Sequence, residues 1–235
     1  MIRLLDYLFV LRPTQFFPLW MTMLSGYALA SGSTLFSFEP LPILAILLLT
    51  LNFGAVFVFN QIVDRENDFH NNKLFLISHN HIPLKLAWIE AIIITLISVV
   101  SGYWVSVPFM LCALGFTGVG ILYNFIGFMN RPILGAAMNF SGGVIFFISG
   151  AYAVQTGAYS FYQLLFFSLP YGFAWAAVYL LVTLPDIEGD RKFGKRTAAV
   201  HYGIKPTLTA AFVLDGLALV SSILTFELVI ISTVG

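Results

Sequence analysis

Seven long apolar segments, separated by short connections, dominate this sequence. They cover residues 14–31, 41–62, 84–104, 107–128, 133–153, 161–184 and 206–233. A helix of about 20 apolar residues is long enough to cross the hydrocarbon core of a bilayer. Only 9% of the residues are charged, against about a quarter in soluble domains. We therefore predict an all-α protein, a polytopic transmembrane helical bundle of about seven spans that forms a single domain over residues 1–235.

The positive charges predict how this bundle is oriented. All eleven Lys and Arg residues lie on one side of the predicted spans, at positions 3 and 12 and within 65–85, 131 and 191–205. The connections on the other side, near 32–40, 104–107 and 154–160, carry none. The positive-inside rule then places the N-terminus and the charged loops in the cytoplasm. The net charge of zero and the lack of a basic tract exclude a nucleic-acid partner.

Two loops on this predicted cytoplasmic face carry carboxylates at intervals of four residues. Asn60 lies at the end of the second segment, Asp64 and Asp68 follow it, and Asp186 and Asp190 follow the sixth. Side chains four apart lie on one face of a helix, so we expect two pairs of carboxylates to converge on one negative pocket. Oxygen donors with no His or Cys among them suit Mg²⁺, which commonly bridges carboxylates to a substrate phosphate.

Several cations near the two acidic loops are candidates for binding the remaining phosphate oxygens. They are Lys73, Arg191, Lys192, Lys195 and Arg196. In the alternative interpretation, these charges only cap helices and solvate loops. That interpretation leaves unexplained why six of the eleven acidic residues lie within 64–68 and 186–190.

The same residues resemble the UbiA superfamily of intramembrane prenyltransferases. The stretches "NQIVDREND" (60–68) and "PDIEGDRKFGKRT" (185–197) look like its two aspartate motifs. The stretch "LYNFIGFMNRPILGAAMN" (122–139) is similar to the Tyr, Arg-Pro and Asn that follow the fourth span of the family. The resemblance implies that Asn60, Asp64, Asp68, Asp186 and Asp190 bind Mg²⁺, with the four aspartates catalytic, and that Asn60, Tyr123, Arg131 and Asn139 contact the substrate.

The activity that this resemblance implies is a Mg²⁺-dependent transfer within the membrane. A prenyl group would pass from an isoprenyl diphosphate to an aromatic acceptor of the quinone-precursor type, and diphosphate would be released. A central cavity open to the cytoplasmic side would hold both substrates. A non-aromatic lipid acceptor, a non-catalytic scaffold and a transporter remain alternatives, although transport sites tend to lie near the midplane of the membrane.

Several features depart from the family pattern, among them the following three. Gln61 replaces the Asp that commonly follows the first Asn, a change also seen in homogentisate prenyltransferases of the tocopherol type, and it favours an aromatic acceptor. Gly135 occupies a position where many members have Asp. The family usually has nine spans, so the chain is expected to be short at its C-terminus. The first two departures concern the acceptor pocket rather than the diphosphate site.

Overall fold

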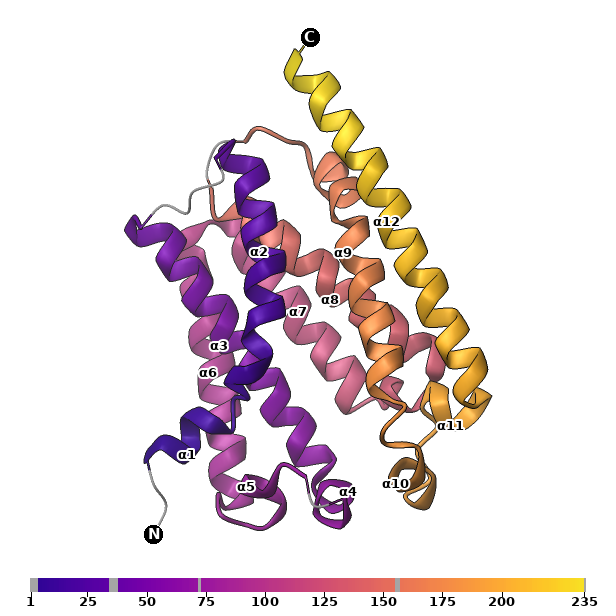
Figure 1. Cartoon of the computed structure of the whole chain (residues 1–235). Helices are drawn as coiled ribbons and strands as arrows, with labels where there is room; N and C mark the ends of the chain where they lie inside the picture. Colours follow the sequence, from indigo (N-terminus) through magenta and orange to yellow (C-terminus); the bar gives the residue numbers. More distant parts are fainter. Residues whose placement is uncertain (1–3, 34–37, 72, 155–156, 235) are drawn as a thin grey trace.

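The computed structural model describes residues 4–33, 38–71, 73–154 and 157–234, with side chains described as far as Phe226. This part of the chain contains helices but no strands (Figure 1). The elements are α1 (Leu4–Phe9), η1 (Pro13–Gln15), α2 (Phe16–Ser31), α3 (Pro40–Val63), α4 (Arg65–His70), α5 (Phe75–Ser78), α6 (Leu84–Val105), α7 (Val107–Asn124), η2 (Phe128–Asn130), α8 (Pro132–Tyr152), α9 (Phe161–Val182), α10 (Ile187–Lys192), α11 (Ala198–Tyr202) and α12 (Ile204–Val234).

Each of the seven predicted segments contains a long helix. Six of these helices, α3, α6, α7, α8, α9 and the part of α12 over Ile204–Phe226, are long and apolar enough to cross a membrane. The first segment forms α2, which has 16 residues and is therefore about 24 Å long at 1.5 Å per residue. The predicted all-α transmembrane bundle is confirmed, with one helix shorter than expected.

Local sequence signals set where several of these helices begin. Ser106 alone separates α6 from α7, and its hydroxyl caps α7 by accepting a hydrogen bond from the backbone N–H of Phe109 at 3.2 Å. Ser160 and Gln163 form a capping box at the start of α9, which satisfies two backbone donors that the helix leaves unpaired. Proline stands in the first turn of α3, α7 and α8, where its missing N–H costs nothing.

Helix α8 lies at the centre of the bundle, between α2, α7 and α9 (Figure 1). Its contact with α2 depends on two glycines. A Cβ atom at Gly26 would lie 1.9 Å from the carbonyl oxygen of Phe147, and one at Gly150 would lie 1.8 Å from that of Met23. The two backbones therefore pack in direct contact, as small residues allow in membrane helices. Helix α12 packs against α9 at the outer side of the bundle.

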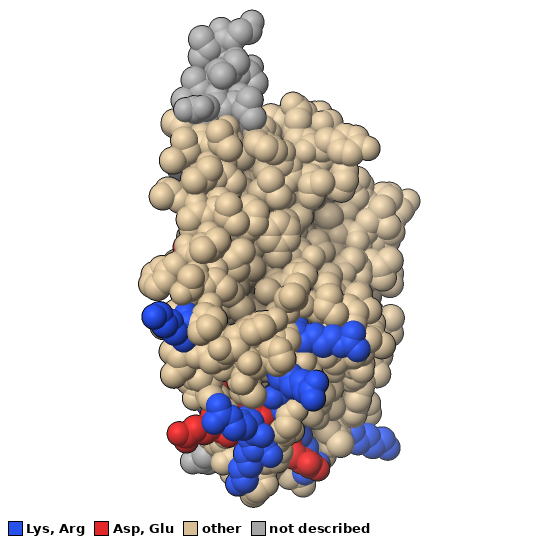
Figure 2. Space-filling view, turned by 90° about the vertical axis from the view of Figure 1, so that its right-hand side faces the viewer, with Lys and Arg blue, Asp and Glu red and all other residues tan. Residues whose placement is uncertain are grey.

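Most of the charged side chains gather at one end of the molecule. Figure 2 shows Lys, Arg, Asp and Glu toward the lower end of one face, and a surface of other residues above them. At this end the short helices α4, α5, α10 and α11 connect the long ones (Figure 1). The loops that carry the two acidic motifs thus open on the same end of the bundle, as the spacing of the segments predicts.

Candidate active site

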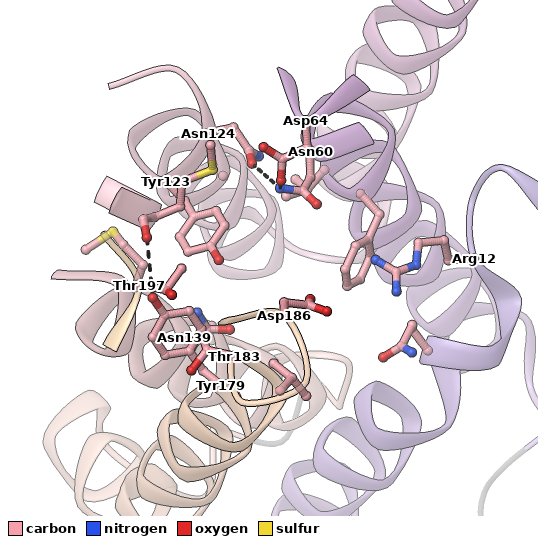
Figure 3. A pocket seen from close by; sticks show the side chains of 18 of the residues that line it. Arg12, Asn60, Asp64, Tyr123, Asn124, Asn139, Tyr179, Thr183, Asp186 and Thr197 are labelled. Carbon is pink, nitrogen blue, oxygen red and sulfur yellow. Dashed lines mark hydrogen bonds between the residues drawn. The ribbon is translucent and has the colours of Figure 1, made fainter. Parts of the chain in front are cut away.

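A cavity of about 580 Å³ lies between α3, α7, α8 and α9 and reaches the charged end of the bundle. At that end, Asn60, Asp64 and Asn124 lie across the opening from Tyr179 and Asp186, and Tyr123 lies at its side, next to Asn124 (Figure 3). Farther from the loops the wall is apolar and contains Phe53, Val56, Phe116, Phe146 and Trp175. The cavity therefore joins a polar compartment to an apolar one.

The first acidic motif lines the cavity at the end of α3. Its helical hydrogen bonding continues past the last residue of the helix, because the N–H of Asp64 donates to the carbonyl of Asn60 at 2.9 Å and the N–H of Asp68 to that of Asp64 at 2.8 Å. Asn60 Nδ2 also donates to Asp64 Oδ2 at 3.3 Å and to Asn124 Oδ1 at 3.1 Å. The amide oxygen of Asn60, the atom that would bind a metal, is not used in these bonds.

The second acidic motif lies opposite the first. The N–H of Asp190 donates to the carbonyl of Asp186 at 2.8 Å, so these two side chains also share one helical face. Asp190 accepts hydrogen bonds from Thr197 Oγ1 at 3.2 Å and from Asn67 Nδ2 at 3.4 Å. Because Asn67 belongs to α4 and Asp190 to α10, this last bond joins the two acidic loops directly.

Two lysines connect the loops crosswise. Lys73, from the loop after α4, forms an ion pair with Asp186. Lys195, from the loop after α10, lies 2.8 Å from Asp64 Oδ2 and 4.0 Å from Asp190 Oδ1. Each lysine therefore neutralises a carboxylate of the other loop, and the two motifs are held facing each other.

The donor set fits a hard divalent cation. The carboxylates of Asp64, Asp68, Asp186 and Asp190 and the amide of Asn60 all line the cavity, and oxygen ligands of this kind suit Mg²⁺. Among the described residues, no three His, Cys, Asp or Glu side chains already form a compact metal-binding group. The lysine pairs explain this arrangement, because Asp64 and Asp186 are each engaged by an ammonium group. A cation that bound here would take carboxylates over from the lysines.

Burial and repulsion shift the protonation of two of these acids. Burial, followed by the negative charge of Asp64, raises the pKa of Asp68 to about 7, against the opposing effect of Lys195, Arg12 and Lys73. Burial also raises the pKa of Asp190, although Lys195 opposes this shift. The environment at this end of the cavity thus disfavours the charged form of these two carboxylates, as expected of a site built to receive positive charge.

Replacing Asp68 with Asn is expected to stabilise the protein without metal at pH 8. In an unfolded chain Asp titrates near pH 3.9, so the folded state binds this proton more tightly. Asp68 therefore lowers the free energy of unfolding as the pH rises from about 4 to about 7, and this destabilisation is fully present at pH 8. Thermal unfolding in EDTA should show a higher Tm for Asp68→Asn at pH 8 and a smaller difference at pH 5.

The control for this measurement is Glu66→Gln, because Glu66 is exposed on the same short helix. This control should unfold like the wild type at both pH values. A lower Tm for Asp68→Asn than for the wild type at pH 8 would contradict the electrostatic argument.

The predicted substrate-binding residues divide into two groups. Asn60, Lys73, Tyr123, Asn139 and Lys195 line the cavity. Arg131, Arg191, Lys192 and Arg196 are exposed and are not part of its wall. The Arg131 guanidinium instead lies 5.9 Å from the centre of the Phe128 ring. The geometry therefore supports a direct role for the first group only.

Arg12 is a cavity residue that the sequence analysis did not select. It has a left-handed backbone conformation, with φ of 59°, and its guanidinium lies 4.8 Å from the centre of the Phe57 ring. The buried Gln61 holds this turn in place, because its Nε2 donates to the carbonyl of Val10 at 2.7 Å. Gln61 thus supports the turn and is not part of the cavity wall, so any influence on the acceptor would act through the position of Arg12.

The sequence analysis also did not identify several other polar residues of the cavity wall as site residues. They are Gln15, Asn67, Asn71, Asn124, Tyr179, Thr183 and Thr197. Asn67 and Asn71 are also four residues apart, and Asn71 Nδ2 donates to Asn67 Oδ1 at 2.9 Å. Asn124 Nδ2 is buried and has no hydrogen-bond partner, which makes it a donor available to a ligand.

The absence of an acid at position 135 has a steric explanation. A Cβ atom at Gly135 would lie 2.1 Å from the hydroxyl oxygen of Tyr179. The Tyr179 hydroxyl therefore fills the space that a side chain at 135 would occupy, and it donates a long hydrogen bond of 3.5 Å to the carbonyl of Met129. In this chain an uncharged phenol thus stands at that part of the cavity wall.

The fold and the cavity together define an integral multi-pass membrane protein with paired acidic motifs at one end of a helical bundle. The sequence model of the UbiA prenyltransferase family matches residues 19–234. The chain belongs to this family, and the predicted resemblance is confirmed. Comparison with curated protein sequences gave no match.

Several solved structures have a similar fold. A UbiA homolog from Archaeoglobus fulgidus bound to DMAPP and Mg²⁺ has a TM-score of 0.75 and 21% identity, with 97% of this chain and 85% of that chain covered. The structure of a UbiA homolog from the same organism bound to GPP and Mg²⁺ gives a TM-score of 0.77 and 22% identity, with 95% and 78% covered. A structure described for digeranylgeranylglyceryl phosphate synthase in membranes gives 0.72 and 21%, with 97% and 79% covered.

Proposed function

We propose that this protein transfers a prenyl group from an isoprenyl diphosphate to an acceptor within the membrane, with Mg²⁺ and with release of diphosphate. The observation that carries the proposal is the convergence of two acidic motifs at the polar end of a cavity whose other end is apolar. A substrate with a charged head and a hydrocarbon tail matches this division. The structures of UbiA homologs bound to DMAPP or GPP together with Mg²⁺ support the same assignment.

In this proposal Asn60, Asp64, Asp68, Asp186 and Asp190 hold Mg²⁺. Bound there, the metal neutralises charge on the diphosphate and so makes it a better leaving group. Lys73, Lys195 and Arg12 line the same compartment and would bind phosphate oxygens. Asn124 Nδ2 would donate its unused N–H to the diphosphate, which removes the cost of a buried donor without a partner.

The reaction breaks the bond between C1 of the prenyl group and the diphosphate oxygen. The electron pair leaves with the diphosphate, and the allylic group becomes positive. The rings of Tyr123 and Tyr179 stand in the cavity wall with centroids 6.2 Å apart, and negative ring faces stabilise such a cation. The acceptor then forms a bond to C1 and loses a proton.

For the acceptor we propose an aromatic ring of the quinone-precursor type. The uncharged wall around Tyr123, Asn139, Tyr179 and Thr183 offers hydroxyl and amide groups to a phenolic ring. A non-aromatic lipid alcohol is the second candidate, because one of the similar structures is described for digeranylgeranylglyceryl phosphate synthase. We further propose that the charged end faces the cytoplasm, in keeping with the distribution of Lys and Arg.

The test is an assay of diphosphate release by the full-length protein in nanodiscs. C10, C15 and C20 prenyl diphosphates are each supplied with phenolic ring acceptors or with glycerophosphate lipid acceptors, with Mg²⁺ or with EDTA. The proposal predicts release that needs Mg²⁺ and one class of acceptor, together with a product whose mass contains the prenyl group. If no combination gives either release or Mg²⁺-dependent binding of the diphosphate, the proposal is wrong.

A further inference from the structure

Four aromatic rings from four different helices form the apolar end of the cavity. They belong to Phe53 of α3, Phe116 of α7, Phe146 of α8 and Trp175 of α9, and all four line the cavity. Their centroids are 4.7 Å apart for Phe116 and Phe146, 5.2 Å for Phe146 and Trp175, and 5.4 Å for Phe53 and Phe146. We call this group the ring floor.

The ring floor lies at a defined depth below the polar compartment. Phe53 precedes Asn60 by seven residues on α3, and Phe146 follows Asn139 by seven residues on α8. Seven residues of helix span about 10 Å at 1.5 Å per residue. Since Asn60 and Asn139 both line the polar part of the cavity, about 10 Å separates that part from the rings.

The bundle is closed behind the ring floor. Phe53, Phe116 and Phe146 belong to one core cluster with Leu19, Leu49, Phe109 and other buried side chains. At the edge of the floor, Trp175 Nε1 donates to Thr22 Oγ1 at 3.0 Å and so connects α9 to α2. A hydrocarbon tail that entered from the polar end would meet packed side chains at this depth.

We infer that the ring floor limits the donor to a short-chain isoprenyl diphosphate with about two isoprene units, an inference that rests on the proposed function. An extended chain advances about 1.2 Å per covalent bond, as the reach of an extended backbone shows. An isoprene unit of four bonds is then about 5 Å long, and two units match the depth of about 10 Å. A tail of four units is about twice as long as the space in front of the rings.

A longer tail would have to leave the cavity sideways. Val178 and Val182 line the cavity on α9 and are 52% and 57% exposed, so this side offers an exit. If long tails used that exit, the ring floor would not influence chain length. Substitutions in the ring floor therefore distinguish a tail that ends at the rings from a tail that leaves sideways.

The test compares C5, C10, C15 and C20 diphosphates in nanodiscs at a fixed acceptor concentration. The wild type should prefer C10 over C20 by at least about tenfold in kcat/KM, which corresponds to 1.4 kcal/mol. Phe146→Ala should raise the C20 to C10 ratio at least about tenfold, because it opens the floor into the core. Gly142→Ala, whose Cβ atom would lie 3.7 Å from the Phe116 ring in ordinary contact, should shift the preference toward C5.

The matched control is Phe147→Ala. Phe147 is as buried as Phe146, at 3% and 1% exposure, but it packs on Tyr171 outside the cavity. It should leave the C20 to C10 ratio unchanged. Equal turnover of C10 and C20 by the wild type, or a ratio that Phe146→Ala and Gly142→Ala both leave unchanged, would overturn the inference. Failure of the proposed function would look different, since no diphosphate of any length would then react.

Discussion

Replacing either Asp64 or Asp186 with Asn is expected to lower kcat/KM for Mg²⁺-dependent diphosphate release by about 100- to 1,000-fold. The two residues lie on opposite loops, and both line the polar end of the cavity. A metal that neutralises a leaving group supplies several kcal/mol, and each 1.36 kcal/mol changes the rate tenfold. Asn keeps the shape of the side chain and removes its charge, so the loss reports on the interaction with the cation.

The measurement combines turnover with a titration of Mg²⁺. Both variants should need more Mg²⁺ for half-maximal activity, because each has lost one anionic ligand. Glu188→Gln is the matched control: Glu188 lies between Asp186 and Asp190 in the sequence but is not part of the cavity wall. If Glu188→Gln lost as much activity as Asp186→Asn, the rate would depend on the total charge of the loop and not on which carboxylates line the cavity.

The convergence of the acidic motifs could be predicted from the sequence because it depends on local rules. Apolar segments of sufficient length define the spans, and an even number of spans between two loops places both on one face. A spacing of four residues then aligns Asp64 with Asp68, and Asp186 with Asp190. The hydrogen bonds that continue the helices through these residues follow from the same spacing.

The same local rules could have sorted the cations of the second loop. On α10, Asp190 points to the cavity, and each further residue turns the side-chain direction by about 100° at 3.6 residues per turn. Arg191 and Lys192 therefore turn away from it. Lys195 again lies at the cavity, because Gly194, with φ of 70°, ends the helix and reverses the direction of the chain. The direction of each side chain around the helix thus predicts which cations line the cavity better than their closeness to the aspartates in the sequence.

Arg12 and Tyr179 could not have been placed by local rules. Arg12 reaches the cavity through a left-handed turn held by Gln61, which is 49 positions away in the sequence. Tyr179 takes the space next to Gly135 on another helix. Each placement depends on how two separate helices pack, and a single sequence does not specify the rotation of apolar helices about their axes.

Replacing Lys195 with Met is expected to lower kcat/KM for the isoprenyl diphosphate by about 10- to 100-fold. Charged hydrogen bonds contribute about 1.5–3 kcal/mol, and Lys195 is the cation that stands between Asp64 and Asp190. Met keeps much of the length of the side chain and removes the ammonium group. The matched control is Lys192→Met, three residues earlier, where the side chain is exposed and outside the cavity. This control should change kcat/KM by less than about twofold, as surface positions away from a site usually do.

The two roles of Lys195 give this variant a distinctive kinetic signature. Without a metal, Lys195 neutralises Asp64 and so competes with Mg²⁺ for that carboxylate, whereas during turnover it would bind a phosphate oxygen. Its loss should therefore raise the KM for the diphosphate and, at the same time, lower the Mg²⁺ concentration needed for half-maximal activity. A Mg²⁺ requirement that rose in parallel with KM would show instead that Lys195 only holds the two loops together. A general loss of structure is not expected to raise the KM for the diphosphate and lower the Mg²⁺ requirement at the same time. The two titrations therefore distinguish a lysine that gives up Asp64 to the metal from a lysine that only supports the site.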